Sequence, residues 1–211
     1  MPKQTFFNLP EDKKERILNT AIDEFSKYYY HKASISRIVK NAGIAKGSFY
    51  QYFEDKKDLF KYLIGRAGEE KMKHFNPIMT NIDNVNFFEV VRAMYITGIR
   101  FAMENPRLQQ IADNFIRDND TRLKQEILGD NIPKSNEMFI SMINKGIEKG
   151  DLDPSIDVAL TASIITNLNI AISDYFIKEV KGKDYMEMMP LVDKMLYILK
   201  NGIKSKKEGE K

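Results

Sequence analysis

Residues 42–60 read Ala-Gly-Ile-Ala-Lys-Gly-Ser-Phe-Tyr-Gln-Tyr-Phe-Glu-Asp-Lys-Lys-Asp-Leu-Phe, and this stretch decides the fold of the N-terminal part of the chain. Upstream, Ser34 precedes an apolar series typical of a short helix buried on one face: Ile35, Ile38, Val39 and Ala42. Gly43 ends that helix, because glycine adopts the left-handed backbone at little cost. A second helix runs from near Ala45 to about Phe53. Two short helices joined by a glycine turn predict a helix-turn-helix, whose second helix faces the major groove of DNA.

The second of these helices has an apolar side and a polar side. Phe49 and Phe53 are four residues apart and are expected to face inward. The polar side chains that remain outside suit DNA, since they offer donors and acceptors to phosphates and base edges: Lys46, Ser48, Tyr50 and Gln51. Gly47 would let the backbone approach closely. Any one of these side chains alone is more typical of ordinary solvated surface.

A further helix, the fourth of the chain, is predicted to begin after Asp55. Asp55 and Asp58 bracket Lys56-Lys57 in an arrangement resembling a capping box. Lys56 would then lie beside the positive N-terminus of the helix. The pattern predicts that Lys56 binds a phosphate.

The segment from about Leu9 to Phe60 resembles the N-terminal DNA-binding domain of the TetR family of bacterial transcriptional regulators. The residues that match are Ser34, Ala42, Gly43, Gly47, Ser48, Phe49, Tyr50, Phe53, Lys56 and Leu59. The resemblance implies that the DNA backbone is held by Ser34, Tyr50, Tyr52 and Lys56. It implies that bases are faced or approached by Ser36, Lys46, Gly47, Ser48 and Gln51.

Three positions depart from the family pattern. Tyr29 stands where many relatives have a glycine after the first helix, so that helix is expected to end differently. Tyr52 replaces a common histidine and changes the reach toward a phosphate. Ala45 is a weaker N-cap than the serine often found there.

The rest of the chain predicts further helices. The first helix is expected from Pro10 to about Tyr28, and the helix after Asp55 should end near Phe75, where Asn76-Pro77 interrupts it. The other expected helices are 86–105, 106–115, 121–128, 134–149, 156–180 and 185–204, and strand signals are nearly absent. We therefore predict an all-α chain, with a helix-turn-helix DNA-binding domain in residues 1–55, a helical-bundle effector-binding and dimerisation domain in 56–204, and a basic disordered tail in 205–211.

Charge is unevenly distributed along the 211 residues. Residues 1–75 carry 15 Lys and Arg against 10 Asp and Glu, residues 76–199 carry 13 against 18, and residues 200–211 carry 5 against 2. The basic N-terminal part favours contact with a polyanion at one end of the chain.

Composition argues against several classes of protein. The absence of cysteine excludes disulfides and thiolate metal sites, and two histidines without a metal-binding or catalytic spacing predict neither a metal, a cofactor nor an enzyme. There is no run of about 18 uncharged apolar residues that would span a membrane, and no apolar signal segment at the start. We expect a cytoplasmic protein.

The last two predicted helices are strongly apolar. By the family resemblance they imply a homodimer formed through about 156–180 and 185–204; a monomer with one large core is the alternative. A two-fold dimer would read a palindromic DNA operator.

The resemblance also implies release from DNA by a small, partly apolar effector. The candidate effector contacts are Phe101, Met103, Phe115, Met138, Met142 and Asn167, although any one of them alone is more typical of a core position. A helical adaptor that binds protein or anionic membranes remains the alternative function, and it leaves the 42–60 pattern unexplained.

Overall fold

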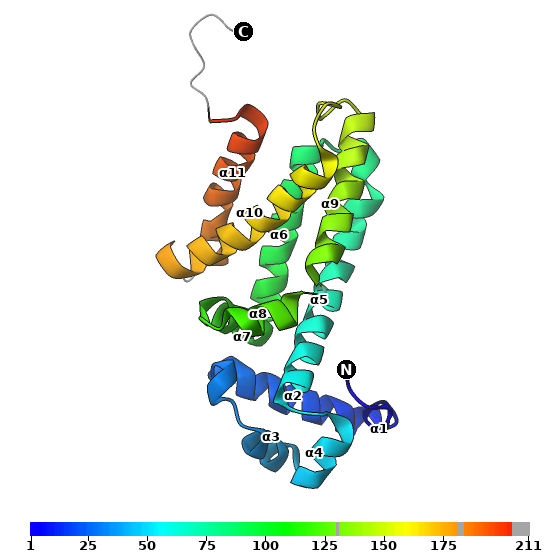
Figure 1. Ribbon diagram of the computed structural model, residues 1–211, viewed down its shortest axis with the longest axis vertical. Coiled ribbons are helices and arrows are strands. Elements are labelled where there is room, and N and C mark those ends of the chain that lie inside the picture. The colour runs from blue at the N-terminus through cyan, green and yellow to red at the C-terminus, as the bar shows by residue number, and fades with distance from the viewer. Residues whose placement is uncertain (130, 181–183, 204–211) are drawn as a thin grey trace, which may run out of the picture. The chain divides into compact units, whose positions relative to one another are not determined.

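The computed structural model describes residues 1–129, 131–180 and 184–203, with the backbone alone for 131–134. All regular structure in these ranges is helical, and they contain no strand (Figure 1). The chain therefore has the all-α fold, with an N-terminal helix-turn-helix followed by a helical bundle.

The chain packs into two compact units. Unit 1 comprises residues 1–74 and 101–133, and unit 2 comprises residues 75–100 and 134–211. The packing units do not test the functional division proposed at residue 55, which stays a prediction. The predicted tail, 205–211, lies outside the described residues.

Unit 1 contains the helix-turn-helix and the helices that support it. Its elements are α1 (Gln4–Phe7), α2 (Glu11–Lys27), a 3-10 turn η1 (Tyr30–Lys32), α3 (Ile35–Ala42), α4 (Lys46–Tyr52), most of α5 (Lys56–Thr80), the end of α6 (Phe87–Glu104), α7 (Pro106–Arg117) and α8 (Thr121–Leu128). The apolar stripe of α2 is buried, with Ile17, Leu18, Ala21 and Phe25 at most 2% exposed. The helix α2 packs on α3 and α7, so it supports the first helix of the helix-turn-helix.

Unit 2 contains the remaining helices. They are the rest of α5 and α6, η2 (Ile82–Asn84), most of α9 (Asn131–Glu148), α10 (Val158–Tyr175) with a π-helical extension η3 (Phe176–Val180), η4 (Tyr185–Met188) and α11 (Met189–Asn201). Asp151 joins the start of α6 to the loop after α9, since its carboxylate accepts from the Phe87 N–H and the Asn86 amide, both at 2.9 Å. By length and composition Val158–Val180 would also suffice to cross a membrane, but a helix in a protein core or interface has the same composition.

Several predicted boundaries were wrong. The helix expected to end near Phe75 continues to Thr80 and contains Pro77, because proline has a helical φ and here costs only one N–H bond near the helix end. The last helix starts as a 3-10 turn at Tyr185 and becomes α-helical at Met189, next to Pro190. The helix α1 was not predicted at all.

Candidate DNA interface

The turn between α3 and α4 has the predicted glycine geometry. Gly43 adopts φ 66°, in the left-handed region. The N–H of Ile44 then reaches back to the Val39 carbonyl at 3.0 Å and closes the end of α3. This turn fixes the direction in which α4 leaves α3.

The two sides of α4 differ as the sequence predicts. Phe49 and Phe53 are completely buried and pack against one another with ring centroids 5.5 Å apart. Tyr50 is 44% exposed on the opposite side. Lys46, Gly47 and Gln51 are also exposed, and Ser48 is half-buried. The structure therefore brings four of the predicted base-facing residues together on one helix, Lys46, Gly47, Ser48 and Gln51, with Ser36 exposed on α3.

Two predicted DNA-binding residues have side chains already engaged within unit 1. Tyr52 lies on the inner side of α4, 6% exposed, with its ring centroid 6.3 Å from that of Phe6. The Lys56 ammonium donates to the carbonyls of Tyr30 at 2.7 Å and Ala33 at 3.0 Å, and a longer bond reaches the His31 carbonyl at 3.4 Å. Lys56 thus joins α5 to η1.

Burial affects the titration of this lysine and the tyrosine beneath it. The Lys56 ammonium lies 4.6 Å from the centroid of the Tyr30 ring. Desolvation lowers the pKa of Lys56, and desolvation reinforced by Asp55 raises the pKa of Tyr30 to about 12. The Lys56 ammonium already donates to three carbonyls in and next to η1. To bind a phosphate, this ammonium would have to give up one of these hydrogen bonds or share a donor between a carbonyl and the phosphate.

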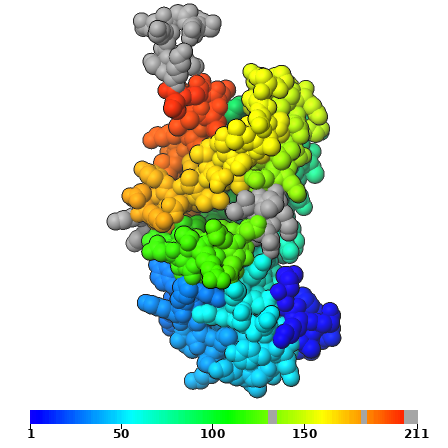
Figure 2. All heavy atoms as spheres, in the orientation of Figure 1, coloured from blue at the N-terminus to red at the C-terminus, as the bar shows by residue number. Residues whose placement is uncertain are grey.

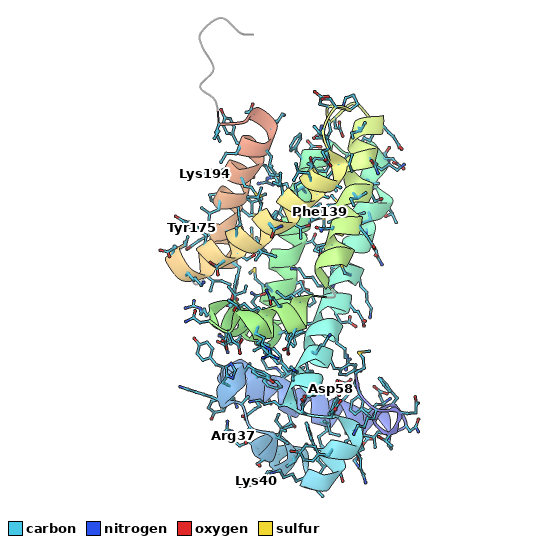
Figure 3. The ribbon with its side chains drawn as sticks, in the orientation of Figure 1. Arg37, Lys40, Asp58, Phe139, Tyr175 and Lys194 are labelled. Atoms are coloured by element: carbon cyan, nitrogen blue, oxygen red, sulfur yellow. The ribbon has the colours of Figure 1, made fainter. Side chains whose placement is uncertain are left out.

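The start of α5 has the predicted cap. Asp55 accepts the N–H of Asp58 at 2.8 Å, and the Asp58 carboxylate accepts the N–H of Glu54 at 3.2 Å. Figure 3 shows Asp58 there, together with Arg37 and Lys40 on α3. The reciprocal pairing fixes the chain between α4 and α5.

At the start of α3 the predicted cap forms differently. Ser34 does occupy the N-cap position, but its hydroxyl makes no capping bond. Instead its N–H donates to the Glu24 carboxylate of α2 at 2.7 Å, and the same carboxylate pairs with Arg37. Glu24 and Arg37 were missed, although Glu24 lies seven residues after Ile17 and so on the apolar face of α2.

The end of α3 is also bound to α2. The Arg16 guanidinium donates through Nε to the Ala42 carbonyl at 3.1 Å. Both ends of α3 are therefore fixed by side chains of one longer helix.

The predicted effector residues are divided between the units. Phe101, Met103 and Phe115 belong to unit 1, where Phe115 packs against Phe60 with centroids 5.8 Å apart. Met138, Met142 and Asn167 belong to unit 2. Met142 is buried, whereas Asn167 is exposed and donates to the Ser163 carbonyl at 2.8 Å. Their role in effector binding stays a prediction.

Comparisons with known proteins agree with this geometry. The sequence profile described as "Bacterial regulatory proteins, tetR family" matches residues 17–63. The crystal structure of a TetR family transcriptional regulator from Chloroflexus aurantiacus J-10-FL is 31% identical, with a TM-score of 0.62, and the match covers 98% of this chain and 100% of that one.

Two further relatives from Bacillus subtilis match over most of their length. The fatty acid metabolism regulator protein is 22% identical over 193 residues, covering 90% of this chain and 95% of the relative. The structure of the regulator FadR in complex with stearoyl-CoA has a TM-score of 0.70 at 20% identity, covering 90% of this chain and 99% of that one. With α4 presenting a polar outer face on a glycine turn and the likeness extending along the whole chain, this protein is a DNA-binding transcriptional regulator, not an enzyme, and belongs to the TetR family.

Proposed function

We propose that this chain is a repressor that binds a palindromic operator as a homodimer in the cytoplasm and is released by a small, partly apolar effector. The observation that carries the DNA-binding part is the contrast across α4, where Phe49 and Phe53 are fully buried while Lys46, Gly47 and Gln51 are exposed. The major groove is wide enough to admit an α-helix, and exposed polar side chains of this kind can pair with the donors and acceptors of base edges.

The proposed contacts divide into those with phosphates and those with bases. Phosphates are contacted by Ser34, Tyr50, Tyr52 and Lys56. Bases are contacted or approached by Ser36, Lys46, Gly47, Ser48 and Gln51. To contact a phosphate, the side chains of Tyr52 and Lys56 would have to bind the DNA in addition to their present partners in unit 1, or in exchange for some of them.

Dimerisation is supported by apolar side chains on the surface of unit 2. Leu160 and Ile164 of α10 are 58% and 45% exposed, and Tyr197 and Ile198 of α11 are 62% and 50% exposed. Figure 2 shows α10 (yellow to orange) on the molecular surface. Covering such side chains against a second copy removes apolar area from water, and a two-fold pair provides the two copies of α4 that a palindrome needs.

The effector proposal is narrowed by the relatives. The FadR structure from Bacillus subtilis holds stearoyl-CoA, and its fold covers 90% of this chain. We infer that the effector here is a long-chain acyl thioester of coenzyme A. The candidate contacts remain Phe101, Met103, Phe115, Met138, Met142 and Asn167.

In vitro selection of duplex DNA tests the proposal. The parent protein should enrich a two-fold symmetric motif at fixed salt, and a Tyr50→Ala, Gln51→Ala double variant should not. Stearoyl-CoA, kept below its micelle concentration, should then release the selected duplex, while free coenzyme A should not.

Each arm has its own contrary outcome. Failure of the parent to enrich any duplex at any salt would remove sequence-specific DNA binding and favour the adaptor function. Enrichment that stearoyl-CoA leaves intact would retain the DNA-binding regulator and reject this effector class.

A further inference from the structure

The C-terminal end of α4 is held by residues that precede the helix-turn-helix. The last carbonyls of any helix lack partners within it, and α4 has only seven residues. The Phe49 carbonyl receives the N–H of Phe53 at 2.9 Å. The three carbonyls that follow all receive donors from the start of the chain: those of Tyr50, Gln51 and Tyr52.

Two residues supply all three donors. The Lys3 ammonium donates to the Tyr50 carbonyl at 2.9 Å, and the Lys3 backbone N–H donates to the Tyr52 carbonyl at 2.8 Å. The Thr5 hydroxyl donates to the Gln51 carbonyl. The positive charge of Lys3 therefore lies at the negative end of the α4 dipole, where a cation is stabilising.

Phe6 anchors this segment to the core of unit 1. Its side chain is 0% exposed, and its ring centroid lies 4.8 Å from that of Phe53 and 5.7 Å from that of Tyr62. We call Lys3, Thr5 and Phe6 the N-terminal clasp. The buried ring fixes α1 against α4 and keeps the two donor residues in register with the carbonyls.

A helix as short as α4 depends on such contacts. Isolated helices below about 12 residues are marginal in water, so the shape of α4 is set by what surrounds it. Tyr50 and Gln51 carry side chains proposed to contact DNA, and their own carbonyls are the ones that the clasp holds. If the clasp is loosened, the side chains of Tyr50 and Gln51 should therefore become less well fixed in position.

We propose that Lys3, Thr5 and Phe6 are positioning residues for DNA recognition, which fix α4 in its reading geometry without contacting DNA themselves. The clasp lies before residues 17–63, the part matched by the family profile. The link from clasp to recognition rests on the proposed function.

A double variant, Lys3→Met with Thr5→Val, tests the clasp while leaving Phe6 in the core. Its control is Gln4→Ala, because within the described part of the chain the Gln4 side chain bonds only to the exposed Asn8. Two measurements are made on the full chain: amide hydrogen exchange across α4, and affinity for the parent's selected duplex and for poly(dI-dC) over a range of salt.

The clasp predicts faster exchange in α4 by roughly five- to thirtyfold and a similar loss of affinity for the selected duplex. Affinity for poly(dI-dC) and the salt dependence of binding should stay unchanged, because no phosphate contact is lost. Gln4→Ala should match the parent, and Lys3→Arg with Thr5→Ser, which keeps the donors, should restore both properties.

Three results would overturn the proposal. Unchanged exchange in α4 would reject the clasp whether or not the chain binds DNA. Faster exchange with unchanged affinity for the selected duplex would reject its role in recognition. A salt slope lowered by about one would make Lys3 itself a phosphate contact. Should the parent select no duplex, the proposed function fails, and exchange alone decides whether the clasp holds α4.

Discussion

The Glu24 carboxylate accepts hydrogen bonds from two nitrogen atoms of the Arg37 guanidinium, from Nη2 to Oε1 at 2.5 Å and from Nε to Oε2 at 3.1 Å. Glu24 is 5% exposed, and the same Oε1 atom accepts the Ser34 N–H. The hydrogen bond that Arg37 donates to Glu24 raises the pKa of Arg37, and the Arg37 Cζ atom lies 4.3 Å from the centroid of the Tyr28 ring. One buried carboxylate thus ties α2 to the first turn of α3.

Replacing Glu24 by glutamine should destabilise the helix-turn-helix. The substitution keeps the size of the side chain but removes the charge that the guanidinium pairs with, so Arg37 keeps a weaker partner. We expect the Tm to fall by several degrees in thermal unfolding followed by circular dichroism. Arg37→Lys, which cannot donate a planar fork, should have a smaller effect of the same sign.

The control for this pair is Glu11→Gln, since Glu11 is exposed and, among the residues that the structure describes, pairs only with Lys14 three residues along. Its Tm should stay close to that of the parent. An unchanged Tm in Glu24→Gln would mean that the buried pair does not support α3.

Gly47→Ala should separate stability from DNA binding. Gly47 is exposed within α4, and an added Cβ would meet nothing within 4 Å in the free protein. Alanine favours helix by up to about 1 kcal/mol over glycine, so the Tm should hold or rise. Affinity for the selected duplex should fall by about tenfold or more, because a methyl group would occupy the space into which the DNA approaches.

Gly68→Ala is the matched control, since Gly68 is also exposed in a helix with open space around it. It should raise the Tm without changing DNA affinity. If Gly47→Ala behaves in the same way as Gly68→Ala, the backbone at 47 does not approach DNA closely.

Asp120 should make the stability of unit 1 depend on acid pH. Its carboxylate accepts the Leu123 N–H at 2.9 Å as the N-cap of α8 and lies 3.2 Å from His31 Nε2. The Leu123 hydrogen bond, aided by His31, lowers the pKa of Asp120 in the folded protein. Between the folded and unfolded pKa values the unfolded chain binds more protons, so this stabilisation is complete above about pH 4 and is lost as pH falls through the folded pKa.

The measurement is the difference in Tm between the parent and Asp120→Asn across pH 2 to 7. Asparagine can still accept the capping bond but does not titrate. The parent should be more stable at pH 7, and the difference should close toward pH 2. Asn119→Ala, which alters an exposed neighbour, should give a difference that does not vary with pH, and a constant difference for Asp120→Asn would contradict the assignment.

Ile164→Asp should separate the proposed dimer. Ile164 is 45% exposed on α10, and burying a charge there against a second copy would be costly. Sedimentation velocity should show a monomer, with weaker binding to the selected duplex because two half-sites are no longer bound together. Ser141→Asp, at an exposed position of α9, should remain dimeric, and a dimeric Ile164→Asp would place the interface elsewhere.

The parts that the sequence could predict are those set by local chemistry. Phe49 and Phe53 are spaced to face one side of a helix, Gly43 has a backbone conformation that other residues rarely adopt, and Asp55 caps the helix that follows it. Each follows from periodicity or from a single residue's conformational preference. The outer face of α4 could be predicted because Phe49 and Phe53 mark the inner face, and the residues on the opposite side of the helix must then face outward.

The parts that were missed depend on residues far apart in the chain. α1 has only four residues, and its position comes from Phe6 packing against Phe53. Ser34 is at the predicted position, but its hydroxyl makes no capping bond, and its N–H donates to Glu24, ten residues away. No pattern in the neighbouring sequence predicts such pairs, because the contacts that stabilise them form only in the tertiary structure.

Reading of DNA by α4 is tested most sharply by in vitro selection with Lys46→Gln beside the parent. Lys46 is the first residue of α4 and is exposed, and lysine favours guanine where glutamine favours adenine. We expect a symmetric motif in which one base pair of each half-site changes from guanine to adenine and all other positions stay the same. The same motif from both proteins, or a motif without two-fold symmetry, would contradict the claim that α4 of a dimer reads the operator.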